Sequence, residues 1–341
     1  MVVVESFAVA VTLCAITMLC WGSWANTQKL AGADWPFQLF YWDYSLGVLL
    51  LALLSAFTLG SLGPAGRPFL ADLAQADPGA LWSAFIGGVI FNLSNILLVA
   101  AIGIAGMAVA FPVGVGLALV IGVATSYLAK PDGSPALIGL GVLAIAAAIV
   151  LDAAAYRRVA SSTAATPRLG LALSVAAGVL MGFFYQFVVK AMATDFQTPE
   201  PGKLGPYAAI AVFSLGLFLS SFLWNTIAMR MPFQGEPVAI GPYFRAAPGV
   251  HLVGILGGAI WNIGMTLSIL ASGAAGPAIS YGLGQGATMV AALWGVFVWR
   301  EFRAAPRGTN TLLALMFLLY VVGLGLLVVA RLPGVRVPGL G

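Results

Sequence analysis

The sequence contains few of the residues that build catalytic centres. Only 8% of its 341 residues are charged, and it has one histidine and two cysteines. An enzyme site would need histidines, cysteines or acids clustered at ligand spacing, and the scattered acids of this chain do not supply that pattern. Cys14 and Cys20 lie six residues apart on one predicted helix. That spacing separates their Cα atoms by about 9 Å, too far for a disulfide bond. We therefore expect no enzyme, no metal site and no cofactor.

Long polar stretches are also absent, so the sequence leaves no room for a soluble domain. Hydrophobic residues make up 61% of the chain, and the mean hydropathy is +1.02. A helix needs about 20 apolar residues to cross the ~30 Å hydrocarbon core of a bilayer. Ten stretches meet this need, over residues 6–27, 36–58, 81–103, 107–129, 134–155, 169–190, 205–225, 250–272, 277–298 and 310–330. The sequence predicts an all-α polytopic membrane protein with ten transmembrane helices.

The basic residues lie mostly at the ends of the apolar stretches, which is typical of membrane anchoring and not of a nucleic-acid patch. Nine of the 15 Lys and Arg residues fall in odd-numbered loops, and six fall in even-numbered loops or the C-terminal tail. The positive-inside rule therefore favours odd-numbered loops in the cytoplasm and both termini outside. No Lys or Arg precedes the first stretch, so we expect a retained helix there. We expect the protein in a bacterial-type inner (plasma) membrane.

Two segments of the chain are copies of each other. Residues 87–130 and 257–300 align without a gap at an offset of 170, and 13 of the 44 pairs are identical. A composition this biased would give roughly four identities by chance. The copies hold spans three and four and spans eight and nine, so the repeating unit is five spans. Because five is odd, the second unit enters the membrane from the opposite side. We expect two inverted five-helix repeats, 1–165 and 166–341, with a substrate site between them, as in secondary transporters.

Five short motifs carry a resemblance to a known family. They are Trp21-Gly22-Ser23-Trp24, Asp43-Tyr44-Ser45, Phe69-Leu70-Ala71-Asp72-Leu73-Ala74-Gln75, Gly87-Gly88 with Asn92 and Asn95, and Trp294-Gly295 through Arg300-Glu301-Phe302-Arg303. In their order and spacing the sequence resembles the drug/metabolite transporter superfamily, and within it the ureide permease family. The resemblance runs over most of the chain. It implies ten helices in two inverted five-helix repeats and proton-coupled import of allantoin, uracil or related oxo-heterocycles.

The sequence departs from the family in one place. Plant members carry a long polar segment between spans five and six with a nucleotide-binding-like motif. Here only about Tyr156–Arg168 occupies that place, without a glycine-rich loop, so no nucleotide role is implied. Related families of the same superfamily take up rhamnose or glucose, and a sugar/proton symporter of that type is therefore an alternative.

Asp43 is the acid that lies deepest in a predicted span, about two turns into the second one. A carboxylate in hydrocarbon is costly, so such a residue is a functional candidate by default. We predict that Asp43 couples transport to protons; a structural pair with Lys29 at the end of span one is the alternative. Asp152 is also within a span, but Arg157 and Arg158 lie about one turn away, so we expect an interfacial ion pair there.

Polar side chains occupy equivalent positions in the two copies. Asn92 and Asn262 correspond to each other, and Asn95 and Thr266 each lie one turn further along. A carboxamide offers a donor and an acceptor together, which suits the imide edge of an oxopyrimidine or a sugar diol. We predict that these side chains line one central cavity; hydrogen bonding between helices is the alternative. His251 begins span eight beside the interface and is expected to be structural.

One face of span nine carries Tyr281, Gln285 and Thr288, at i, i+4 and i+7. We predict that this face contacts the substrate. The aromatic candidates for stacking on a heterocycle or sugar ring are Trp21, Trp24 and Trp261. A tryptophan near a span end is otherwise an interfacial anchor. The glycine-rich run at 282–286 indicates either a hinge or tight helix packing.

Together these features predict a secondary active transporter, coupled to protons, for a small neutral polar metabolite such as a nucleobase, ureide or related oxo-heterocycle. A passive channel would need a ring of charged or carbonyl ligands, which the sequence does not show. A multidrug or metabolite exporter of the same fold is a further alternative. The expected partners are the small-molecule substrate, a proton and membrane lipid, with no nucleic acid; the oligomeric state is left open.

Overall fold

The structure, a computed structural model, describes residues 1–32, 34–105, 107–159, 168–233 and 235–332. These residues form helices and connections, with one isolated bridge between Met192 and Leu204. Ten spans are long and apolar enough to cross a membrane, which confirms the predicted all-α polytopic membrane fold. They are α1 (Phe7–Ser23) with α2 (Asn26–Leu30), α3 (Phe37–Phe57), α5 (Pro78–Ala105), α6 (Met107–Ala129), α7 (Pro135–Val159), α8 (Arg168–Ala191), α9 (Pro206–Arg230), α10 (Pro248–Ala275), α11 (Pro277–Gly284) with α12 (Ala287–Leu293) and η2 (Trp294–Val298), and α13 (Thr309–Val329).

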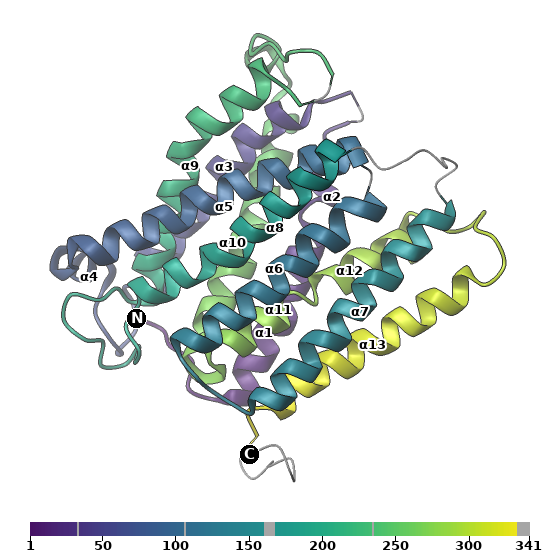
Figure 1. The fold of residues 1–341 in the computed structure, drawn as a ribbon. Coiled ribbons are helices and arrows are strands. Elements are labelled where there is room, and N and C mark those ends of the chain that lie inside the picture. Colours follow the sequence, from purple (N-terminus) through teal and green to yellow (C-terminus); the bar gives the residue numbers. More distant parts are fainter. Residues whose placement is uncertain (33, 106, 160–167, 234, 333–341) are drawn as a thin grey trace.

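Proline marks where many of these helices begin. It is favoured in the first turn because its missing N–H would have no partner there and its φ already suits a helix. Five membrane helices start in this way, at Pro78, Pro135, Pro206, Pro248 and Pro277. The starts of these helices are therefore well defined. The helices lie side by side in one bundle (Figure 1).

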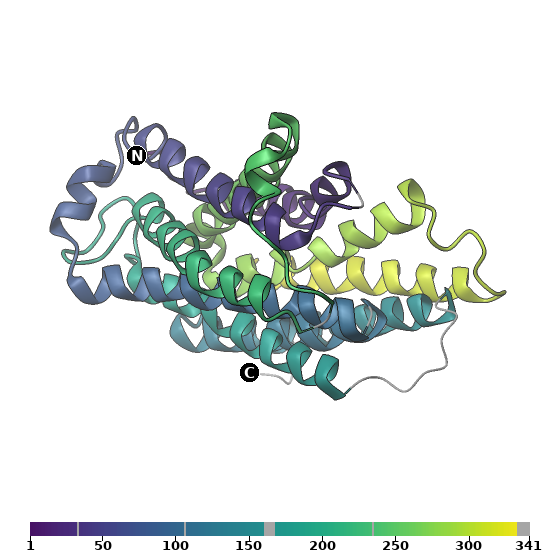
Figure 2. The same cartoon turned by 90° about the horizontal axis from the view of Figure 1, so that it is seen from above.

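The ends of the bundle differ in what they carry. Figure 1 shows α4 (Phe69–Gln75) and the N-terminus at one end, and α2 with the connection from η2 to α13 at the other. The helices α7 and α13 pack against each other at one edge. Seen from above, the purple N-terminal helices lie on one side of the bundle and the blue and teal helices that follow lie on the other (Figure 2).

Glycines allow two helix crossings to be unusually close, and the two crossings are alike. A Cβ atom on Gly88 of α5 would lie 1.9 Å from a backbone carbonyl oxygen of α9, and one on Gly258 of α10 would lie 2.0 Å from a carbonyl oxygen of α3. From the partner helices, Gly216 of α9 and Gly47 of α3 approach α5 and α10 in the same way, at 2.2 and 2.1 Å. Spans three and seven thus cross as spans eight and two do.

Two of the ten spans are interrupted partway across. Span one breaks between α1 and α2, where Trp24 and Ala25 form a turn. Span nine breaks between α11 and α12, at Gln285 and Gly286, where the amide of Gly286 donates to the carbonyl of Leu283 in a tighter i+3 pattern. Discontinuous membrane helices are tolerated where the irregular backbone lines a cavity or is buried in protein. Both breaks lie beside the same cavity, described below.

Arg67 links two connections at the end of the bundle that holds α4. Arg67 donates through Nε to the Asp72 carboxylate at 2.8 Å, and its other nitrogens donate to the carbonyls of Pro199, Glu200 and Lys203. The Asp72 carboxylate also accepts from the amide of Gly205 at 2.6 Å. This network joins the second connection to the sixth. It gives the Phe69–Gln75 motif a structural role.

Candidate functional site

A cavity of about 520 Å³ enters the bundle from the end that holds α2 and the connection from η2 to α13. This volume is within the range of about 300–1,000 Å³ that is typical of small-molecule sites. Its walls come from α1, α2, α5, α6, α7, α8, α10 and the interrupted span nine. Six of the residues predicted to bind substrate line it: Trp21, Trp24, Asn95, Trp261, Gln285 and Thr288.

Aromatic rings form the deep wall of the cavity. The rings of Trp21 and Trp261 stack with centroids 6.0 Å apart and planes 16° apart. The Trp21 indole also donates to the backbone carbonyl of Trp261 at 3.1 Å. Phe91 also packs against Trp261, with ring centroids 4.5 Å apart. A flat ring that enters the cavity therefore meets a preformed aromatic surface.

Two carboxamides and a hydroxyl supply the polar groups of this deep region. Asn95 donates to the hydroxyl of Tyr41 at 3.3 Å, which fixes the orientation of its amide. Gln285 lies in the turn that interrupts span nine, and Thr288 donates to the Gln285 backbone carbonyl at 2.8 Å. Asn95 and Gln285 are 5% and 8% exposed, so each retains a small accessible surface in the cavity wall.

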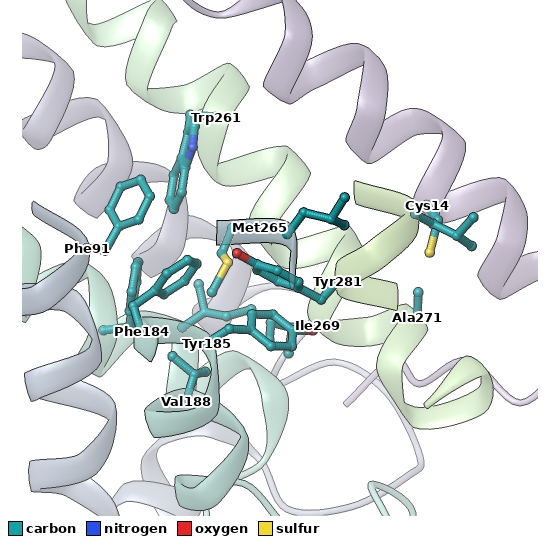
Figure 3. Packing of buried hydrophobic residues seen from close by; sticks show 14 of the residues in the cluster. Cys14, Phe91, Phe184, Tyr185, Val188, Trp261, Met265, Ile269, Ala271 and Tyr281 are labelled. Atoms are coloured by element: carbon teal, nitrogen blue, oxygen red, sulfur yellow. The ribbon is translucent and has the colours of Figure 1, made fainter. Parts of the chain in front are cut away.

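Tyr281 does not line the cavity, so the predicted shared face of span nine is only partly right. Its side chain is fully buried, and its hydroxyl donates to the backbone carbonyl of Met181 at 3.2 Å. The helix is interrupted at Gln285 and Gly286, so ideal helical spacing does not carry one face from α11 into α12. Tyr281 instead packs with Phe184 and Tyr185 beneath the cavity, as Figure 3 shows.

The aromatic layer beneath the cavity, formed by Phe184, Tyr185 and Tyr281, is thin. Phe184 lines the cavity from below, whereas Phe187, less than one helical turn further along α8, lines a second cavity of about 610 Å³ that opens at the opposite end. Between them Tyr185 and Tyr281 pack with ring centroids 4.9 Å apart, and Figure 3 shows these rings close to Val188. The second cavity has lysines near its mouth, at Lys130, Lys190 and Lys203.

The prediction that Asn92 and Asn262 line a common cavity is wrong in this structure. Asn92 accepts from the Tyr41 hydroxyl at 2.8 Å and donates to the carbonyl of Leu217 at 3.0 Å. It therefore links α5 to α3 and α9. Asn262 donates to the hydroxyl of Ser214 on α9 at 3.2 Å, and Thr266 donates to Asn262. Asn92 and Asn262 are therefore engaged in hydrogen bonds between helices, and Thr266 in a bond within α10.

Asp43 lies outside the cavity, between α3 and α10, and the alternative pair with Lys29 is also wrong. One carboxylate oxygen accepts from the Tyr243 hydroxyl at 2.7 Å, and the other lies 2.9 Å from Nδ1 of His251. The rings of Tyr243 and His251 meet edge to face at 4.7 Å. Burial and the neighbouring Asp43 carboxylate raise the pKa of Tyr243, so its hydroxyl stays a hydrogen-bond donor at physiological pH. His251, which was expected to be structural, contributes its Nδ1 atom to this cluster.

Lys29 belongs to a second cluster at the mouth of the cavity. Its ammonium lies 3.5 Å from Glu301 and 4.2 Å from the centroid of the Trp299 ring. Glu301 also accepts from the Tyr156 hydroxyl at 2.8 Å. The mouth cluster of Lys29, Glu301, Tyr156 and Trp299 thus joins α2, α7 and the connection after η2. A Cβ on Gly295 would lie 2.8 Å from the Tyr156 hydroxyl and 2.9 Å from the Glu301 carboxylate, so a larger residue at position 295 would displace this pair.

The predicted ion pair of Asp152 is wrong as well. Arg157 and Arg158 are exposed at the end of α7, and neither forms a salt bridge with Asp152 in the described residues. Residue 157 lies five positions further along the helix and residue 158 six, which turns their side chains away from the face that holds Asp152. Asp152 lines the cavity.

Sequence reasoning did not single out several lining residues. Phe91, Phe184, Tyr156 and Trp299 all reach the cavity, yet each looks like an ordinary aromatic residue of a membrane helix. The sequence pointed to these lining residues only indirectly. Phe91 is the repeat partner of Trp261, and Glu301 lies in the motif Arg300-Glu301-Phe302-Arg303.

Comparison with known proteins finds ureide permeases of plants among the relatives of this chain. The chain is 23% identical to Ureide permease 1 of Arabidopsis thaliana over 383 residues, covering 96% of this chain and 98% of that protein. It is 33% identical to Probable ureide permease A3 of Vigna unguiculata over 129 residues, 36% of this chain and 34% of that one. A solved crystal structure aligns at a TM-score of 0.59 and 18% identity, over 96% of this chain and 99% of that chain, and so shares the fold. The family model of ureide permeases matches residues 40–166 and 146–330, and the chain belongs to the ureide permease family.

Proposed function

We propose that this protein is a secondary active transporter for a small, neutral nitrogen heterocycle of the ureide or oxopyrimidine type, driven by protons. The observation that carries the proposal is the cavity between two interrupted spans, in a chain of the ureide permease family. Interrupted membrane helices expose backbone groups at mid-membrane, which is where transporters of many folds bind their cargo. The cavity is closed on one side by the aromatic layer beneath it.

The chemistry of the wall fits a flat cargo with amide edges. The Trp21–Trp261 stack offers a face to a planar ring, and stacking of this kind contributes about 1–3 kcal/mol per ring. The amides of Asn95 and Gln285 and the hydroxyl of Thr288 supply donors and acceptors around it. An apolar drug would leave these groups unpaired, at a cost of about 1–3 kcal/mol for each buried group.

The proposed movement is alternating access, in which the binding site opens first to one end of the bundle and then to the other. We take residues 1–165 and 166–341 as the two repeats, which the matching glycine crossings support. If one repeat rocks against the other, the aromatic layer of Phe184, Tyr185 and Tyr281 opens to the second cavity while the mouth cluster closes. The barrier is about one turn of α8 thick, so a small displacement suffices.

The proposed proton site is the Asp43 cluster. Asp43 lies where α3 crosses α10, with its carboxylate held by Tyr243 and His251. Protonation of Asp43 removes the charge that holds the histidine and the tyrosine, and so weakens the contact of η1 (Tyr243–Arg245) with the two helices. This contact lies at the same end as the mouth of the cavity, which is how a proton would bias its opening.

The orientation follows from charge. The cavity opens at the end that carries the odd-numbered loops, where nine of the 15 Lys and Arg residues lie. On the positive-inside rule we infer that this end faces the cytoplasm, and hence that this conformation is open to the cytoplasm. The chain is an integral membrane protein. The expectation of a bacterial-type inner membrane has no support from the curated relatives cited here, which are plant proteins.

Counterflow into proteoliposomes tests the cargo class. Purified protein is reconstituted with unlabelled uracil, allantoin, rhamnose or glucose inside, and uptake of the labelled compound is followed. We expect uptake of uracil or allantoin, to a level that a Trp21→Ala variant does not reach. Uptake of the sugars alone would instead identify a sugar symporter. A parallel counterflow assay with a lipophilic cation tests the remaining alternative, because uptake of the cation alone would identify a drug exporter.

A further inference from the structure

Asp152 is a buried acid in the cavity wall that the proposed mechanism has not yet used. It is 6% exposed, it lines the cavity, and its Oδ1 atom has no hydrogen-bond partner. Across the described residues, no lysine, arginine or histidine lies within salt-bridge distance of it. Oδ1 is itself buried, and Asp152 as a whole forms part of the cavity wall. A buried carboxyl group without a partner in such a wall is an unsatisfied polar group that a ligand can complete.

The groups around Asp152 do not compensate a negative charge. On its own helix Tyr156 lines the cavity one turn away, and its hydroxyl is committed to Glu301. Glu301 is itself an acid, and the nearest cation at the mouth, Lys29, pairs with that glutamate. From the neighbouring helix α13, Tyr320 is fully buried and its hydroxyl has no partner. The adjacent face of α6 contributes apolar residues such as Val115.

An ionised carboxyl in this position would be buried without a partner, next to a second acid. Such a charge is expensive, and a carboxyl group avoids the expense by holding its proton. A neutral carboxylic acid presents one donor and one acceptor side by side. That pattern is complementary to a cis-amide edge, in which a C=O and an N–H group point the same way.

We propose that Asp152, in its protonated form, binds the cis-amide edge of the cargo through two hydrogen bonds. Its O–H donates to the cargo carbonyl, and its carbonyl oxygen accepts from the adjacent cargo N–H. Ureides, hydantoin rings and oxopyrimidines carry this edge, and sugars do not. The inference rests on the proposed function and assigns the specificity-determining residue of its site.

The pairing also links cargo binding to pH. When Asp152 is ionised it can accept but not donate, and the cargo carbonyl faces a negative charge. Cargo affinity should therefore be highest while Asp152 holds its proton and fall once it is lost. An asparagine at this position would offer the same donor and acceptor at every pH, because a carboxamide is isosteric with a carboxylic acid and does not titrate.

The test is a binding titration of purified protein with uracil and with allantoin across a pH series, for wild type and three variants. Asp152→Asn is expected to keep the affinity of the protonated protein and to lose its pH dependence. Asp152→Leu is expected to weaken binding by more than about tenfold, since two hydrogen bonds are lost. Asp195→Asn, the same chemical change at an exposed acid outside the cavity, should match the wild type. Melting temperature and gel-filtration profile establish that each variant is folded.

Two results would overturn the inference. If Asp152→Leu binds uracil and allantoin like the wild type, Asp152 does not touch the cargo. If Asp152→Asn loses binding although it is folded, the ionised carboxylate and not the neutral acid is required. Failure of the proposed function looks different, because then the wild-type protein itself would bind neither compound and would exchange sugars in counterflow.

Discussion

Trp21 and Trp261 are 240 positions apart in the sequence and act as one unit in the structure. Their rings stack at 6.0 Å, and the indole nitrogen of Trp21 donates to the backbone carbonyl of Trp261. The hydrogen bond fixes the tilt of the Trp21 ring, so the aromatic surface exists before any cargo arrives. Because Trp21 comes from span one and Trp261 from span eight, this surface forms only when the two proposed repeats are assembled.

Removal of this surface should weaken cargo binding without unfolding the protein. We expect Trp21→Ala to reduce cargo affinity by about ten- to a hundredfold, the loss of one stacking contact. The measurement is a binding titration with uracil or allantoin. Trp82→Ala is the matched control, because Trp82 is 63% exposed on α5 and does not line the cavity. Equal effects of the two changes would show that Trp21 is only an interfacial anchor.

The Asp43 cluster should matter for accumulation and not for exchange. We expect Asp43→Asn to abolish uphill uptake under an imposed proton gradient, because the side chain no longer titrates, while counterflow continues. Tyr243→Phe removes one of the two contacts and should weaken coupling partially. Accumulation of substrate by Asp43→Asn, measured in proteoliposomes with a pH step, would place the proton site elsewhere, and Asp152 would be the first candidate.

The glycine crossings should be intolerant of a single methyl group. A Cβ on Gly88 would meet a backbone carbonyl oxygen at 1.9 Å, and backbone cannot move aside as a side chain can. We expect Gly88→Ala to lower the melting temperature and the yield of folded protein. Gly79→Ala on the same helix has nothing within 4 Å of the added atom. It should be neutral or stabilising by up to about 1 kcal/mol through helix propensity.

The Arg67–Asp72 ion pair should contribute more to the stability of the protein than the Lys29–Glu301 pair does. Asp72 is buried, and removal of its arginine leaves an uncompensated charge, which costs about 3–5 kcal/mol. Arg67→Ala should therefore destabilise the protein strongly in thermal unfolding. Lys29→Ala breaks the pair with Glu301. The side chains of Lys29 and Glu301 are 48% and 35% exposed, so this change should alter stability by only about 0–1 kcal/mol. A comparable loss from both changes would contradict the structural role of the Phe69–Gln75 motif.

Much of the fold follows from hydropathy and repeat arithmetic. Ten apolar stretches became ten spans, because the length of a span is set by the bilayer and not by the details of packing. The duplicated segment also makes Gly88 and Gly258 equivalent positions, and the structure places both at close helix crossings. Such properties are local or periodic, so one sequence suffices to find them.

The site was harder, because helical spacing fixes which residues share a face but not which face meets a cavity. Asn92 and Asn262 are equivalent by sequence and are both consumed between helices. Tyr281 and Gln285 are one turn apart by count, yet the break after Gly284 separates them. Asp152 was assigned to nearby arginines by sequence distance, whereas their side chains point away from it.

The two interruptions have a further consequence. They occur in spans one and nine, whereas the proposed repeat would pair span one with span six and span nine with span four, and both of these are continuous helices, α8 and α6. The two repeats therefore share equivalent helix crossings, but their interrupted spans are not equivalent. If the repeats exchange conformations during transport, the pocket that opens on the other side is not the same as this one. Cargo should consequently bind with one affinity from the side on which the cavity now opens and with another from the opposite side, so that uptake and efflux reach half-saturation at different cargo concentrations.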